Sequence, residues 1–210
     1  MSDFINLSKG QQINLSKMPS IDLSKGGRGL NKVIVGLGWD PATETVQKRG
    51  LFGRPVASRG PEVDCDAFAF VLHNGKFKNK DDLVYFGNLE NRDKSIRHMG
   101  DNLTGDGDGD DEQIVIDLSR ISADSIVIAV NIYRGKEKGQ HFGNLQNAFI
   151  RIVDMNTNNE LCKFTLDGKY NGTTSVIFGE LVKHNGEWNF KAIGEASRGN
   201  SISEVVSSYY

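Results

Sequence analysis

The sequence predicts an all-β protein, an antiparallel β-sandwich of two packed sheets with a few short helical turns. Apolar runs of strand length, rich in Val, Ile and Phe, recur through most of the chain, and long stretches of helical periodicity are absent. Asn-Gly pairs, which favour the positive φ of tight hairpin turns, separate some of these runs. Because one sheet of this size would leave an apolar face in water, two packed sheets are expected.

The N-terminal part contains a repeat with an eight-residue period: INLSK at 5–9, INLSK at 13–17 and IDLSK at 21–25. Within each unit, Ile and Leu are two residues apart and share one face of an extended strand. We therefore expect residues 1–29 to supply short half-buried strands, and a flexible polar arm is the alternative.

Eight apolar runs follow: VIVGLGW, AFAFVLH, LVYF, IVIDL, SIVIAVNIY, AFIRIVD, CKFTL and SVIFGELV. The Asn-Gly pairs at 74–75 and 185–186 predict hairpins over 67–78 and 175–193.

Short helical turns are expected near 144–148 and in the segment 195–210, which is either a tail or a short helix. Ser201 and Glu204 have capping-box spacing there. Residues 48–61, rich in Gly, Pro and Arg, are expected to form a basic loop insertion and not a central strand.

The chain of 210 residues has a formal net charge of −2, so no global basic field for nucleic acid exists. It starts without a signal-like segment and has no apolar run long enough for a membrane helix, which predicts a cytoplasmic protein without membrane insertion. Cys65 and Cys162 lack metal-site spacing and are expected to be buried free thiols. We interpret residues 1–210 as one domain.

The acidic segment DNLTGDGDGDDE, residues 101–112, is the clearest chemical signal. Its carboxylates are the oxygen ligands that calcium prefers, and its glycines would let a short loop turn them inward. Asp106, Asp108 and Asp110 match the first, third and fifth positions of an EF-hand. However, Asp111 replaces the turn glycine and a strand follows, so an EF-hand is not predicted.

A second acidic pair precedes an apolar strand, where the period of two places Asp64 and Asp66 on one face. Asp40, at the end of another strand, is a third candidate. These carboxylates could share a cation with the glycine-rich loop. The alternative is that they are solvated loop acids.

Other kinds of site have less support. The histidines lack H-x-x-x-H spacing and are expected at hairpin ends or on the surface; they are His73, His98, His141 and His184. No phosphate loop or dinucleotide fingerprint is present. Paired carboxylates could also serve a glycosidase, but a metal site explains so many acids at least as well.

Several ordered motifs resemble the TerD family of tellurite-resistance and stress-response proteins: GLGWD, VDCDAFAF, DDLVYFGN, RHMGDNLTGDGDGDDE, FGNLQNAFIRIVD and SVIFGELVKHNGEW. The resemblance covers nearly the whole chain. It implies a β-sandwich that binds calcium (Ca²⁺) through acidic loops, in a cytoplasmic bacterial protein with a role in resistance to tellurite, some phages and colicins. It also implies other tellurite-resistance proteins as partners, a membrane-associated complex among the possible assemblies.

The family's D-L-D-A-S motif falls on residues 64–68, with both aspartates kept and Phe68 in place of serine. Its G-D-N-x-T-G loop and acidic continuation fall on residues 100–112. The candidate metal ligands are Asp40, Asp64, Asp66, Asp101, Asn102, Asp106, Asp108, Asp110, Asp111 and Glu112.

The leading hypothesis is a calcium-binding scaffold that acts through partners and not by catalysis. The first alternative is a metal-dependent hydrolase acting on nucleotides or phosphoesters. The second is a purely structural acidic protein without a specific ion site.

Overall fold

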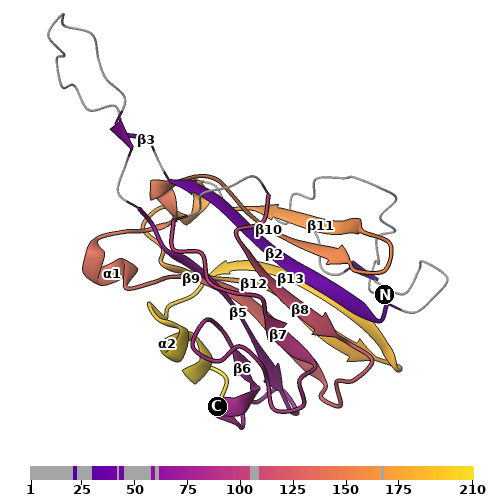
Figure 1. Cartoon of the computed structure of the whole chain (residues 1–210). Helices are drawn as coiled ribbons and strands as arrows, with labels where there is room; N and C mark the ends of the chain where they lie inside the picture. Colours follow the sequence, from indigo (N-terminus) through magenta and orange to yellow (C-terminus); the bar gives the residue numbers. More distant parts are fainter. Residues whose placement is uncertain are drawn as a thin grey trace, which may run out of the picture.

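The computed structural model describes residues 21–22, 30–41, 43–44, 58–59, 62–104, 109–166 and 168–210. Its strands form two packed antiparallel sheets, one 6-stranded and one 5-stranded, with a further 2-stranded ribbon (Figure 1). The predicted β-sandwich is confirmed. Within these ranges, none of the helices has the length and apolar composition needed to cross a membrane.

The 6-stranded sheet has the order β1-β13-β12-β9-β5-β6. Its strands are β1 (Ile21–Asp22), β13 (Glu187–Ala196), β12 (Ser175–His184), β9 (Ser125–Ile132), β5 (Cys65–Leu72) and β6 (Leu83–Val84).

The 5-stranded sheet has the order β11-β10-β2-β8-β7. Its strands are β11 (Asn159–Thr165), β10 (Leu145–Asp154), β2 (Lys32–Pro41), β8 (Glu112–Asp117) and β7 (Ile96–His98). The ribbon pairs β3 (Thr43–Glu44) with β4 (Ser58–Arg59).

Strand β5 is buried on both faces, which explains its unbroken apolar sequence. Cys65, Ala67 and Ala69 belong to the core between the sheets. Phe68 and Phe70 point to the other face, where they pack with Val205 and Val206 of the C-terminal helix. The helix thus covers an apolar sheet face that would otherwise meet water.

Short helices lie between the strands and after the last one. They are α1 (Gly135–Lys138), α2 (Ile202–Ser207), and the 3₁₀ turns η2 (Lys80–Asp82), η3 (Phe142–Asn144) and η4 (Gly168–Tyr170). The Ser201 hydroxyl accepts a bond of 3.3 Å from the Glu204 amide, so the predicted cap of α2 is confirmed. The helical turn expected near 144–148 is wrong beyond Asn144, because β10 begins at Leu145 and pairs there with β2.

The hairpin predicted over 175–193 is confirmed as β12–β13, with positive φ at its Asn-Gly turn. The turn predicted at 74–75 is also present. Its return arm, however, forms only the isolated bridge between Lys76 and His73, the residue that follows β5. The next amide, of Phe77, donates instead to the Tyr209 carbonyl at 2.7 Å, so the C-terminus takes the place of a longer hairpin.

The last N-terminal repeat contributes β1, which pairs with β13. The repeats before residue 21 and most of the predicted basic loop, 48–57, lie outside the described residues. Cys65 and Cys162 are buried free thiols, as predicted.

Candidate metal centre

Asp64 and Asp66 lie at the start of β5, with Cys65 between them directed into the core. The strand period places the two carboxylates on the same face. Asp66 is 1% exposed, and Asp64 is partly buried. The chain thus holds two acidic side chains together where one of them has almost no contact with water.

The free edge of β5 brings the acidic loop to this pair. Strand β9 pairs with β5 over its whole length, but β6 pairs with it only at Ala69 and Phe70. The Ala67 amide on the uncovered stretch donates to Glu112 Oε2 at 2.7 Å. Glu112 is the first residue of β8, so this bond ties the two sheets together beside the aspartates.

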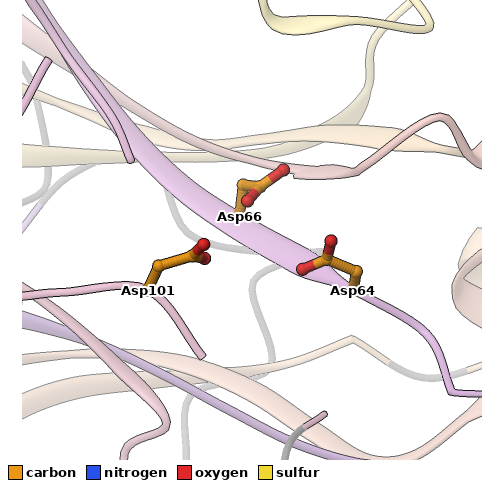
Figure 2. A group of neighbouring side chains, drawn as sticks. All are labelled: Asp64, Asp66 and Asp101. Atoms are coloured by element: carbon orange, nitrogen blue, oxygen red, sulfur yellow. The ribbon is translucent and has the colours of Figure 1, made fainter. Parts of the chain in front are cut away.

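Asp101 completes the cluster from the segment that follows β7. Figure 2 shows its carboxylate pointing toward those of Asp64 and Asp66. Ligand oxygens of the three residues all lie within 4.8 Å of one another. Residues more than 30 positions apart in the sequence therefore meet at one point, which is the arrangement expected of a cation site.

The electrostatics of the cluster oppose three negative charges without a counterion. Burial, then Glu112 and Asp64, raises the pKa of Asp66 to about 9. Burial and Asp101 also raise the pKa of Asp64, which Lys138 partly opposes. Asp64 Oδ1 and Asp66 Oδ2 are buried with no hydrogen-bond partner among the residues that the structure describes. A cation would satisfy both oxygens.

Glu112 is anchored by protein groups. Besides the Ala67 amide, its Oε2 lies 3.5 Å from His98 Nε2. Burial raises the pKa of Glu112, and the His98 and Ala67 contacts lower it in part. The expectation of a surface or hairpin-end position is wrong for His98, which is 2% exposed, because β7 directs Ile96 and His98 to its buried face. The alternation of Ile96, Arg97 and His98 is the signal that could have found it.

Asn102 and Asp111 hold the two ends of the acidic loop together. The Asn102 side-chain amide donates to Asp111 Oδ1 at 3.0 Å, and its oxygen accepts from the Thr104 amide at 3.1 Å. Asp111 Oδ2 accepts from the Trp39 amide of β2 at 2.8 Å. These bonds fix where the loop begins and ends, and so help to position Asp101.

Two other candidate ligands, Asp110 and Asp40, form hydrogen bonds with side chains outside the cluster. Arg151 donates to Asp110 Oδ1 at 2.7 Å, and the Asp110 side chain is 3% exposed. The Asn147 side-chain amide donates to Asp40 Oδ2 at 2.8 Å. Neither belongs to the group of Asp64, Asp66 and Asp101.

Asp106 and Asp108 lie outside the described residues.

The glycines of the GLGW motif serve close packing of the acidic loop on β2. A Cβ at Gly36 would overlap the Asp110 carboxylate, and a Cβ at Gly38 would overlap the Gly109 carbonyl and the Phe149 ring. Only glycine leaves room for the loop at these two positions. The motif therefore supports the position of the acidic segment.

The donor set fits a hard cation. Carboxylate oxygens are preferred by calcium and magnesium, and calcium accepts six to eight of them in irregular geometry. Asp64, Asp66 and Asp101 would hold such an ion, whose charge would offset the burial and the carboxylate repulsion that together raise the pKa of Asp66.

Comparisons with known proteins agree with the fold and the motifs. A model of the TerD domain matches residues 4–209. Stress response protein SCP2 of Bacillus subtilis (strain 168) is 46% identical over 199 residues, covering 94% of this chain and 98% of that protein. Tellurium resistance protein TerD of Serratia marcescens is 36% identical over 200 residues, covering 94% and 96%.

A crystal structure of a homologue of telluride resistance protein (TerD) from Streptomyces coelicolor A3(2) has the same fold. It aligns with a TM-score of 0.66 at 20% identity, covering 87% of this chain and 99% of that one.

Proposed function

Since the chain belongs to the TerD family of stress-response and tellurium-resistance proteins, we propose that it contributes to that response as a calcium-binding protein without catalysing a reaction. Its site is the cluster of Asp64, Asp66 and Asp101. Calcium would stabilise the folded protein and fix the acidic loop against the edge of β5.

The observation that carries this proposal is the pair of unpartnered oxygens in the cluster. Asp64 Oδ1 and Asp66 Oδ2 are buried beside a third carboxylate, and no donor among the described residues reaches them. A buried acceptor without a donor costs about 1–3 kcal/mol, and more when it is charged. Solvated loop acids would carry no such penalty, because water would satisfy them.

A hydrolase would use the same cluster differently. It requires an open coordination position and a base that can reach a bound water. His98 is a base near the cluster, but its side chain is 0% exposed and it lies against Glu112. This enclosure favours a role for His98 in holding Glu112, and supports a non-catalytic protein.

A protein without catalysis must act through other molecules. Relatives of this chain include proteins named TerD, TerX and TerZ from Serratia marcescens. We therefore propose other tellurium-resistance proteins as partners in the cytoplasm, with calcium holding the surface that they recognise.

The test replaces the gene with a variant carrying Asp64→Asn and Asp66→Asn together, and measures growth on tellurite. We expect tolerance to fall to that of a deletion strain, while Asp124→Asn, a matched change outside the cluster, keeps full tolerance. Full tolerance in the double variant, at equal protein level, would contradict the proposal.

A further inference from the structure

Helix α1 carries a lysine that lies near the acidic cluster. The helix follows β9, the strand that pairs with β5 (Figure 1). We propose that the Lys138 ammonium is the internal counter-ion of Asp64 and Asp66 in the metal-free protein, and that its charge opposes calcium binding there. Lys138 would thereby limit the calcium affinity of the site, an inference that rests on the calcium function proposed above.

Two hydrogen bonds fix α1 and its flanking residues against the chain that leads into β5. At the start, the Tyr133 amide donates to the Asp64 carbonyl at 2.9 Å. At the end, the Gln140 side-chain amide donates to the Glu62 carbonyl at 2.8 Å. Lys138 lies between these two anchors, so the path of the chain holds it near Asp64.

Left-handed backbone at both ends keeps the connection between the anchors short. Arg134, at the start of α1, has a φ of 54°, and Gly139, at its end, has a φ of 65°. The Lys138 amide donates to the Arg134 carbonyl at 2.9 Å and closes the turn. Positive φ is strained for an arginine, and such strain persists only where the surrounding structure requires it. Here it lets a helix of four residues fit between the two anchors.

The Tyr133 ring supports the Lys138 side chain. The ammonium nitrogen lies 5.2 Å from the ring centroid, within the reach of a cation–π contact, about 6 Å. Among the described residues, Lys138 contacts this ring and forms no ion pair. Its charge is therefore not neutralised by direct contact with a carboxylate and can act on the cluster at longer range.

The charge of Lys138 acts on both aspartates. Burial raises the pKa of Asp64 and of Asp66, and Lys138 lowers both in part because it favours the ionised carboxylates. The same charge that stabilises these carboxylates would repel a calcium ion bound between them.

Two neighbouring cations have other partners. Arg134 is paired with Glu137 at 2.6 Å. The Asn200 amide lowers the pKa of Glu204, and Lys136 contributes to the same shift. Lys136 therefore offers a matched control for the last lysine of α1.

The test compares Lys138→Met, which removes the charge and keeps an unbranched side chain, with Lys138→Arg, which keeps the charge. Lys136→Met is the control on the same helix. Because Lys138 is exposed, water screens its charge, and calorimetric titration in low salt should give a calcium Kd about three- to tenfold lower in Lys138→Met. The other two variants should stay within about twofold of wild type. In about 1 M salt, where charges are screened beyond about 3 Å, the difference should fall below about twofold.

The metal-free protein should respond in the opposite direction. In EGTA, Lys138→Met should lower the thermal midpoint by about 1–3 °C, because the aspartates lose their counter-ion, while Lys138→Arg and Lys136→Met keep it. A structural defect would weaken calcium binding and stability together, whereas loss of a counter-ion strengthens the first and weakens the second.

An unchanged or weaker calcium affinity in Lys138→Met would overturn the opposition to calcium, and so would Lys138→Arg behaving like Lys138→Met. In both cases wild type still binds calcium, so the proposed function stands. An unchanged midpoint of Lys138→Met in EGTA would overturn the role of Lys138 as counter-ion. If wild type binds no calcium, the proposed function fails, and the comparison in EGTA alone decides that role.

Discussion

In the metal-free protein, Asp66→Asn should stabilise the fold, although it removes a proposed calcium ligand. The pKa of Asp66 is raised from 3.8 to about 9, so at pH 7 the folded protein holds a proton that the unfolded chain releases. The associated stability is fully present below pH 3.8 and is lost as the pH rises toward 9. Asparagine carries no such penalty.

The upper limit of the gain follows from this difference. The interval from the pKa of the unfolded chain, 3.8, to pH 7 is about 3 pH units. Each unit corresponds to about 1.4 kcal/mol, so the gain in the free energy of unfolding is at most about 4 kcal/mol. We therefore expect a gain in the free energy of unfolding of about 1–4 kcal/mol. In a chain of this size each kcal/mol raises the thermal midpoint by about 2–4 °C.

The assay is thermal unfolding from pH 5 to pH 8, in EGTA and in excess calcium. Wild type should lose stability in EGTA as the pH rises, and a calcium concentration 100 times the Kd should restore about 2.7 kcal/mol. Asp66→Asn should flatten the pH dependence and lose the calcium response, whereas Asp124→Asn should keep both. A variant less stable than wild type in EGTA at pH 7 would refute this reasoning.

Three further outcomes are expected in urea unfolding. Arg151→Ala leaves the buried Asp110 carboxylate without its guanidinium and should cost about 2–4 kcal/mol with calcium affinity unchanged; a loss of affinity would place Asp110 in the metal site. Val206→Ala opens the contact of α2 with the sheet and should cost about 1–3 kcal/mol, and an unchanged midpoint would show that the helix is dispensable. Deletion of residues 1–25 removes the pairing of Ile21 with Phe190 and should lower the midpoint; an unchanged midpoint would show that the repeats are a dispensable arm.

Local patterns were enough to predict the sheets and part of the site. Alternation along a strand places Asp64 beside Asp66, and Asn-Gly at 185–186 forms its hairpin turn. These features depend on residues close in sequence, for which the strand period and the turn residues decide the geometry.

Contacts between the two sheets could not be predicted in the same way. Asp101 reaches Asp66 because β6 leaves part of β5 uncovered, and that depends on how both sheets are assembled. The pairing of Asp110 with Arg151, 41 positions away, likewise requires β10 to lie beside β2. Sequence proximity grouped Asp110 with Asp101, whereas the fold gives these two residues different partners.

Calorimetric titration of the metal-free protein with calcium, and then with magnesium, tests the central proposal most directly. Oxygen-rich sites of intermediate rigidity have a calcium Kd of about 10⁻⁷ to 10⁻⁵ M, and we expect a value in this range with clearly weaker binding of magnesium. Asp64→Asn should weaken calcium binding at least tenfold, about 1.4 kcal/mol, while Asp124→Asn should leave it unchanged. Calcium binding weaker than about 1 mM, or equal binding of the two ions, would contradict a selective calcium site at Asp64, Asp66 and Asp101.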